Sequence, residues 1–218
     1  MNVVEEKWKK DQYTYFENEW KFKWNKYFNN ETDFKDSILK LEYDKFYNVN
    51  NAFGKLDKAL QICNFLNELA EQKPLQDTEK IIITTLVSCA EAVYRINKPE
   101  ESIGENLVKG FFKPVVLQLE NKIKGYVGEM PYKKSFKPDE ILYLIRNDYI
   151  HNGNFIGTFF KKTNSENYVS MCGDFFYSEK EDKTKLISVK SECRLTYQEF
   201  LTIFLNAFIK NIKKYIKK

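Results

Sequence analysis

The chain has 218 residues, 16% of them aromatic, with only 8 glycines and 5 prolines, a composition that is typical of a packed domain and excludes a disordered protein. Its formal net charge of +4 is compatible with a polyanionic partner but is too small to predict one alone. A chain of this length can form one domain with a substantial core.

Neither a secretory signal nor a membrane span is expected. Charged residues follow Met1 almost at once, and no apolar run approaches the roughly 18 residues that cross a bilayer. The chain has one histidine, no cluster of acids and no C-x-x-C spacing, so we expect no disulfide framework, metal site or cofactor. We therefore predict a cytoplasmic protein. The cysteines are Cys63, Cys89, Cys172 and Cys193.

The N-terminal third is predicted to form three helices. Apolar residues at helical spacing place them at Val4–Phe28, at Thr32–Tyr47 and, after a break at residues 48–51, in a segment that ends near Gln72. The first helix carries an aromatic stripe, which could stack nucleic-acid bases but is more often core or a partner-facing surface. We favour the second interpretation. The stripe comprises Trp8, Phe16, Trp20, Trp24 and Tyr27 or Phe28.

A fourth helix is predicted from Thr78 to Asn97, with Asp77 as its cap. It is apolar on nearly all sides, so we expect it to be the central buried helix. Glu91 and Arg95 lie one turn apart on it. A structural ion pair is the default interpretation of these two residues, and a catalytic role for the carboxylate stays open.

Shorter helices are predicted at residues 105–112 and 115–126, followed by a loop that contains glycine and proline. Lys133, Lys134 and Lys137 lie in this loop. They form either a solvated loop or a phosphate-attracting approach to the next helix, and the sequence favours neither interpretation.

The next helix, Pro138–Asn152, carries the residues with the clearest chemical signature. Proline and two acids begin it, and Asn152 with Gly153 ends it. Inside it are Arg146, one of three arginines against 32 lysines, and His151, the only histidine. An arginine in a chain that prefers lysine so strongly indicates a need for the planar, bidentate guanidinium.

Helical geometry relates these residues to one another. Asn147 and Asp148 lie one turn before His151, so either can orient the imidazole. Arg146 lies about 140° around the helix from His151, so the two side chains flank one edge and do not stack. They can serve one phosphate if the helix loosens at its end or if a second chain completes the site.

After Gly153 the hydrophobic period changes to two. It predicts three short antiparallel strands, at residues 155–161, 168–177 and 185–194. Thr196 and Glu199 form a capping box that opens a last amphipathic helix. We therefore predict an all-α fold: one domain of residues 1–218, a bundle of about six or seven helices, with a small β meander inserted at 155–194 before the last helix.

The segment Arg146-Asn147-x-x-x-His151, which ends a helix and precedes Asn-Gly, resembles the R-[polar]-x3-H motif of the HEPN family of small helical proteins. The likeness covers about eight residues closely and the helical architecture loosely. It implies a metal-independent endoribonuclease of the kind that acts as a toxin or in antiviral defence. One variant of the family has a tyrosine two residues after the histidine; here Gly153 stands there, so a toxin modified on that tyrosine is not implied.

The resemblance implies that Arg146, His151 and Asn147 are catalytic. In cleavage of single-stranded RNA by its 2′-hydroxyl, a histidine suits the proton transfers and an arginine suits the charge on the phosphate. The expected products are a 2′,3′-cyclic phosphate and a 5′-hydroxyl. Further substrate-binding residues are expected beside these three: Asp148, Tyr149, Asn152, Asn154, Lys133 and Lys134.

One histidine per chain leaves the general acid and the general base without a second imidazole. We therefore predict a homodimer in which two motif helices face each other across a shared cleft, an arrangement that the resemblance also implies. An antitoxin or another regulatory partner is compatible with it.

Other interpretations stay open. Arg146 and His151 near a helix end can merely satisfy backbone carbonyls and the helix dipole. The chain can also be a non-catalytic HEPN-like module that binds a nucleotide or a protein. A DNA-binding regulator is disfavoured, because no helix is basic enough to be a recognition helix.

Overall fold

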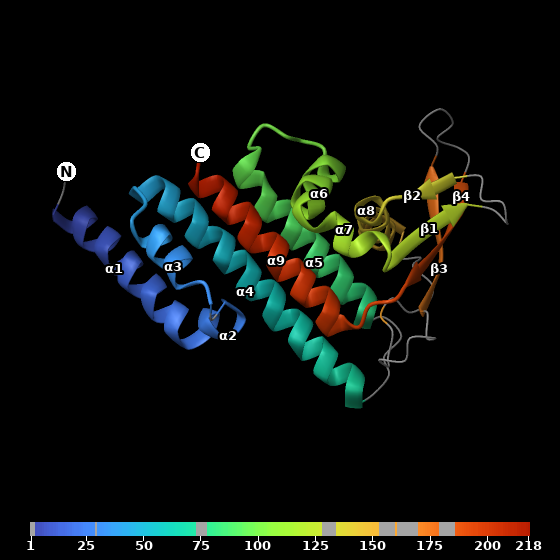
Figure 1. Ribbon diagram of the computed structural model, residues 1–218, viewed down its shortest axis with the longest axis horizontal. Coiled ribbons are helices and arrows are strands. Elements are labelled where there is room, and N and C mark those ends of the chain that lie inside the picture. Colours follow the sequence, from blue (N-terminus) through green and yellow to red (C-terminus); the bar gives the residue numbers. More distant parts are fainter. Residues whose placement is uncertain are drawn as a thin grey trace.

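The computed structural model describes residues 3–28, 30–72, 78–127, 134–152, 160, 170–178 and 186–218. Within them the chain forms a helical bundle with a small antiparallel sheet at one end, opposite the N-terminal helix (Figure 1). This is the fold class that the sequence predicts. Helix α5 (Thr78–Tyr94) lies at the centre, in contact with α4 (Tyr43–Gln72), α8 (Pro138–Asn152) and α9 (Tyr197–Ile216).

The predicted N-terminal helix is confirmed, with one irregularity. Helix α1 (Val3–Glu19) continues through a π-helical turn, Trp20–Trp24, into α2 (Asn25–Phe28). In an α-helix two residues that are four positions apart differ by about 40° in their direction around the axis. A π turn contains more residues and so offsets part of this rotation. The stripe therefore stays on one face, and most of it is core: Phe16, Trp20, Trp24 and Phe28 are buried and pack around Phe53 of α4. Trp8, the first member of the stripe, is 47% exposed and is not core.

The predicted break at residues 48–51 is wrong. Helix α3 (Thr32–Leu39) ends early, and α4 runs unbroken for 30 residues from Tyr43 to Gln72. Val49 within the expected break is fully buried, and the Asn48 amide donates a hydrogen bond of 3.0 Å to the Tyr215 hydroxyl of α9. Tertiary contacts thus outweigh the weak helix propensity of the asparagines.

The fourth and fifth predicted helices are confirmed. Helix α5 ends in a 3-10 turn, Arg95–Asn97, and α6 spans Gly104–Phe112. The next prediction fails in part: after the 3-10 turn Lys113–Val115, helix α7 covers only Val116–Glu120, and a strand follows.

The sheet has four strands in the described residues, in the order β2-β1-β4-β3, all antiparallel. Strands β3 (Ser170–Ser178) and β4 (Leu186–Cys193) agree with two predicted strands, whereas the predicted strand at 155–161 lies outside the described residues except for residue 160. Strands β1 (Ile123–Val127) and β2 (Lys134–Phe136) precede the motif helix and are not predicted by the sequence.

Helix α8 packs closely on one face of this sheet. A Cβ atom at Gly125 of β1 would lie 2.8 Å from the side chain of Ile141, so only glycine permits this approach. The capping box that opens α9 is confirmed: Thr196 Oγ1 accepts from the Glu199 N–H at 3.2 Å, and the Glu199 carboxylate accepts from the Thr196 N–H at 2.7 Å. The start of α9 is therefore fixed by a local signal.

Candidate functional site

Helix α8 begins and packs as its sequence predicts. The Glu140 carboxylate accepts the Lys137 N–H at 2.9 Å, which caps the first turn. Ile141, Leu142 and Ile145 are fully buried, and they fix the face that α8 turns toward α5 and α6. Arg146, next to Ile145, lies at the border of this buried face and is 19% exposed.

The Arg146 guanidinium reaches across to α5. Its Nη2 lies 3.1 Å from Oε2 of Glu91, and its Nε lies 3.5 Å from the Ser88 hydroxyl one turn earlier. The Glu91 side chain is 18% exposed, and its Oε2 is buried without accepting a hydrogen bond from the described residues. The contact between Glu91 and Arg146 is therefore an ion pair held by charge and packing.

A second arginine shares this carboxylate. Nη2 of Arg95 lies 3.5 Å from Oε1 of Glu91, and its Nη1 donates to the Glu101 carbonyl at 2.8 Å. A Cβ atom at Gly104 would lie 3.1 Å from Glu91 Oε2, so the start of α6 closes over the same group. One carboxylate thus faces two guanidinium groups, and the cluster keeps an excess of positive charge.

Arg146 is not fully occupied by these contacts. A guanidinium has five N–H donors, and in the described part of the chain its Nη1 has no hydrogen-bond partner. The group is anchored at Nε and Nη2, and both N–H donors of Nη1 are without a partner among the described residues. Such an anchored guanidinium is suited to binding phosphate oxygens, because its side chain is already held in place and loses little conformational entropy when a ligand binds.

Tyr143 lies one turn before Arg146 on the same edge of α8. Burial raises the pKa of its phenol; Arg146 opposes this shift, and Glu105 and Glu91 add to it. The phenol therefore keeps its proton at neutral pH and can donate a hydrogen bond but cannot act as a base. Sequence reasoning missed this residue, since a half-buried tyrosine at helical spacing resembles any core residue.

A second ion-pair cluster fastens α6 to α8 beside the first. Lys109 of α6 contacts Glu105 at 2.8 Å and Glu140 of α8 at 2.9 Å. Burial alone would lower the pKa of Lys109, but the two carboxylates outweigh it and raise that pKa. This cluster of one lysine and two glutamates carries a net charge of −1 and links α6 to α8.

The structure describes only some of the other predicted site residues. Asn147 and Tyr149 are half-buried on α8. His151 and Asn152 belong to the last turn of the helix and Asp148 to the turn before it, but their side chains lie outside the described part of the structure. The same holds for the side chain of Lys134 in β2, whereas Lys133 and Asn154 lie outside it entirely.

Sequence reasoning singled out Arg146 and left the role of Glu91 open. The signal that could have joined them is the rarity of arginine: two of the three in the chain meet at Glu91. Among the described residues no group of three or more His, Cys, Asp or Glu side chains could hold a metal ion. Cys63 and Cys89 are buried free thiols, and Cys193 is buried as well.

Comparison with known proteins does not name a relative: no family model matches the sequence, and neither the curated proteins nor the solved structures give a significant match. None of the described helices is long and apolar enough to cross a membrane. Function therefore has to be argued from the site alone.

Proposed function

We propose that this protein is a HEPN-like, metal-independent endoribonuclease that cleaves single-stranded RNA by attack of the ribose 2′-hydroxyl. The observation that carries the proposal is the anchored guanidinium of Arg146, which keeps two free donors on the helix that also bears the only histidine. A role as a toxin or antiviral-defence effector follows from the family resemblance alone.

In this proposal Arg146 binds the scissile phosphate. Two Nη1 donors and the excess positive charge beside Glu91 stabilise the negative charge that grows on the phosphoryl oxygens in the transition state. Glu91 does not touch the substrate. It fixes the direction of the guanidinium, and Arg95 keeps the carboxylate from cancelling the charge of Arg146.

His151 moves the protons. An imidazole titrates near neutral pH, so it can take the proton from the 2′-hydroxyl or return one to the leaving 5′-oxygen. Asn147, one turn earlier on the same helix, is the proposed residue that orients the imidazole. Since Arg146 and His151 are about 140° apart around α8, we propose that the second chain of a homodimer completes each site.

The test is incubation of the purified protein with single-stranded RNA in EDTA. His151→Ala and Arg146→Ala are expected to lower the cleavage rate by roughly 10²–10⁴ while circular dichroism remains that of the wild type. The control is Lys10→Ala on the exposed surface of α1, which should leave the rate unchanged. A requirement for added Mg²⁺, or cleavage of DNA at a comparable rate, would refute the mechanism.

The same experiment separates the proposal from a non-catalytic module. A module would bind its nucleotide or protein partner whether or not His151 is present, and no cleavage product would form. A 2′,3′-cyclic phosphate on the 5′ fragment, lost in His151→Ala, identifies the RNase.

A further inference from the structure

Helix α8 carries a second hydrogen-bond donor one turn before Arg146. Tyr143 and Arg146 are three positions apart, so they are neighbours on one edge of the helix, with Cβ atoms roughly 5–6 Å apart. Both side chains are half-buried, so each keeps some contact with solvent. This edge of α8 therefore presents a phenol and a guanidinium side by side.

The Tyr143 hydroxyl has no hydrogen-bond partner in the described part of the chain. Burial, and then the charges of Glu105 and Glu91, raise the pKa of the phenol, so it is protonated at neutral pH. These two carboxylates are already paired with cations: Glu91 faces two arginines, and Glu105 contacts Lys109 at 2.8 Å. The phenol thus remains a donor that the described residues do not use.

A structural role explains the ring of Tyr143 but not its hydroxyl. The ring packs against the core, and a phenylalanine would do the same without an unpaired polar group. Tyr197, by contrast, donates its hydroxyl to Asn64 at 3.0 Å. The hydroxyl of Tyr43 also lacks a partner among the described residues, but it is sealed from solvent, whereas that of Tyr143 is not. A ligand can therefore reach the Tyr143 hydroxyl.

We propose that Tyr143 and Arg146, here called the donor pair, bind one phosphate of the RNA together, the phenol donating to one oxygen and Nη1 of Arg146 to another. Both N–H donors of Nη1 are without a partner among the described residues, and hydrogen bonds from such groups to an anionic oxygen are the stronger kind. The proposal rests on the proposed function, since it adds a residue to the same phosphate site.

The chemistry of the donor pair suits a phosphodiester. The guanidinium supplies one positive charge, and the neutral phenol adds a hydrogen bond without a second charge. A diester has one negative charge, and its two non-bridging oxygens point in different directions, so two side chains can each reach one of them. Tyr143 would then contact the substrate, and its hydroxyl would help to stabilise the charge that grows on the phosphate.

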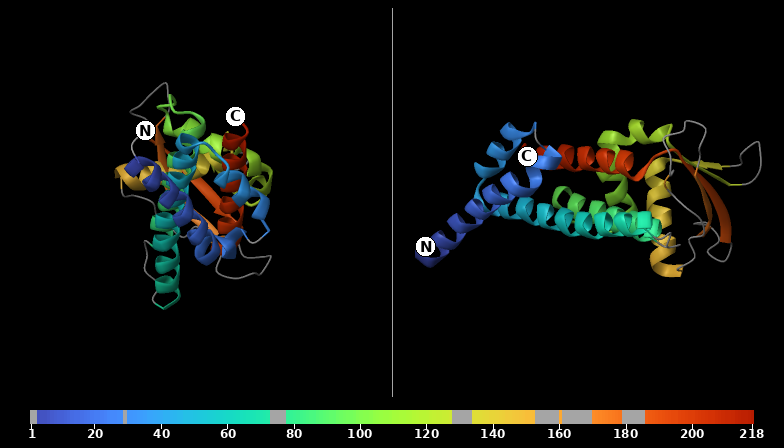
Figure 2. Two further views of the ribbon diagram at one scale, coloured as in Figure 1. Left: turned by 90° about the vertical axis from the view of Figure 1, so that its left-hand side faces the viewer. Right: turned by 90° about the horizontal axis from the view of Figure 1, so that it is seen from below.

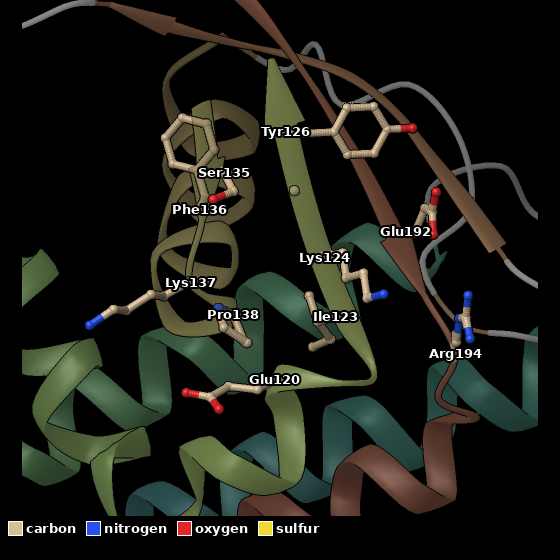
Figure 3. Close-up of a pocket in the computed structure, with 11 residues that line it drawn as sticks. Glu120, Ile123, Lys124, Tyr126, Ser135, Phe136, Lys137, Pro138, Glu192 and Arg194 are labelled. Carbon is tan, nitrogen blue, oxygen red and sulfur yellow. The ribbon is translucent and has the colours of Figure 1, made fainter. Parts of the chain in front are cut away.

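Another cationic region lies at the first turn of α8. A hollow of about 550 Å³ between β1, β2 and this turn is lined by Lys124, Lys137 and Arg194 but also by Glu120 and Glu192. Figure 3 shows Lys137 pointing away from Lys124 and Arg194, so the three cations do not converge on one point. The hollow therefore supplies the control for a phosphate bound elsewhere.

The experiment measures the Kd of a short 2′-O-methyl RNA by fluorescence anisotropy. This RNA cannot be cleaved, because its 2′-oxygen is blocked. Tyr143→Phe removes only the hydroxyl and should raise Kd roughly tenfold. Arg146→Lys should raise Kd by a similar factor. The double variant should lose far less than the roughly hundredfold expected of independent contacts, because a phosphate released by one donor is held less well by the other.

Two variants serve as controls for binding. Tyr15→Phe removes a hydroxyl from a ring of α1 that is 58% exposed and lies at the opposite end of the molecule (Figure 2). Lys124→Gln removes a cation of the hollow. Both should bind the RNA as the wild type does.

Urea unfolding separates a ligand contact from a structural role. Tyr143→Phe should keep the wild-type midpoint, because the lost hydroxyl has no partner among the described residues. A tyrosine that only stabilised the fold would shift the midpoint and leave Kd unchanged. That result would overturn the donor pair.

The outcomes distinguish this proposal from the proposed cleavage. A wild type that binds the RNA through the donor pair but cuts no RNA overturns the cleavage and supports the phosphate site. A wild type that does not bind it, a Tyr143→Phe variant with the wild-type Kd, or an equal loss in Tyr15→Phe would overturn the donor pair, whatever the cleavage assay shows. A loss confined to Lys124→Gln would place the phosphate in the hollow instead.

Discussion

At the scale of single residues, the cluster at Glu91 explains why position 146 is an arginine in a lysine-rich chain. One guanidinium meets the Ser88 hydroxyl through Nε and the Glu91 carboxylate through Nη2, and Nη1 remains for a ligand. A lysine ammonium is a compact point charge and cannot contact Ser88, Glu91 and a phosphate in one plane.

Arg146→Lys should therefore keep the charge and lose the geometry. We expect the cleavage rate to fall at least tenfold, with a change in the free energy of unfolding below about 1 kcal/mol. Single-turnover cleavage and urea unfolding measure the two quantities. Arg95→Lys is the matched change at the more exposed arginine of the cluster and should reduce the rate less. Wild-type kcat in Arg146→Lys would contradict the assigned role.

The same cluster predicts an order of stabilities. Glu91→Gln leaves two guanidinium groups close together without a counter-charge, whereas Arg146→Ala leaves Glu91 paired with Arg95. Glu91→Gln should lower the free energy of unfolding by about 1–3 kcal/mol, and Arg146→Ala should lower it by less. Lys21→Ala, in the exposed pair with Glu17, serves as the control and should have no measurable effect in urea. The reverse order for the two cluster variants would show that Glu91 is not shared.

At the scale of elements, the sequence predicts those helices whose signals are local. Helix α9 has a capping box, α8 has proline at its first position, and α5 has a long apolar run. Strand β1 lacks such a signal, because Ile123 to Val127 is a short segment of mixed polarity that fits a helix or a strand. Pairing with β4, far along the chain, decides its conformation.

The sequence likewise predicts some residues of the candidate site and not others. Composition and helical spacing are sufficient to single out Arg146 and the only histidine. The partner of Arg146 cannot be predicted in this way, because Glu91 belongs to another helix and the contact depends on how α5 and α8 pack.

Substitutions at two helical glycines compare the cost of overpacking with the gain in helix propensity. A Cβ atom at Gly110 of α6 would lie 2.2 Å from the Tyr94 ring, whereas one at Gly54 of α4 would have no neighbour within 4 Å. Gly110→Ala should destabilise the protein by about 1–3 kcal/mol through overpacking, despite the better helix propensity of alanine. Gly54→Ala should stabilise it by about 0.5–1 kcal/mol. Thermal unfolding measures both, and a stabilising Gly110→Ala would show that α5 and α6 are packed less closely than described.

At the scale of the whole molecule, buried thiols predict how stability depends on pH. Burial raises the pKa of Cys63 and of Cys89 from 9.0 to about 12. Above pH 9 the two thiols lose their protons in the unfolded chain but keep them in the folded chain. Their contribution to the free energy of unfolding is therefore fully present below pH 9 and is lost as the pH rises toward 12.

We expect the free energy of unfolding to fall by up to about 1.4 kcal/mol per pH unit for each thiol in this range. Urea titrations at a series of pH values between 9 and 11 give the slope. Cys63→Ala/Cys89→Ala should start from a lower stability, because it creates cavities, but should show a shallower slope. Gly54→Ala should keep the wild-type slope. An unchanged slope in the double cysteine variant would assign the alkaline loss to other groups.

The arrangement of α8 in the molecule bears on the number of chains that the proposed RNase site needs. In the view from below in Figure 2 the last turns of this helix extend beyond α4 and α5, and Ile150 on them is 48% exposed. Ile150, in the last turn of α8, is thus accessible to a second copy. Two copies related by a twofold axis would bring two histidines and two anchored arginines to one cleft, with Tyr149 of each chain beside them.

Subunit mixing tests this directly. Light scattering should give about 52 kDa, twice the 26.0 kDa of one chain, if the symmetric pair forms. Arg146→Ala chains and His151→Ala chains should each be inactive, but some mixed dimers would hold Arg146 from one chain and His151 from the other in a single intact site. Mixing after mild dissociation should therefore restore part of the activity, whereas mixing two batches of the same variant should restore none. Full activity from a monomer at nanomolar concentration would exclude the composite site. A dimer whose mixed form stays inactive would show either that the shared cleft needs both histidines or that each chain supplies Arg146 and His151 to its own site.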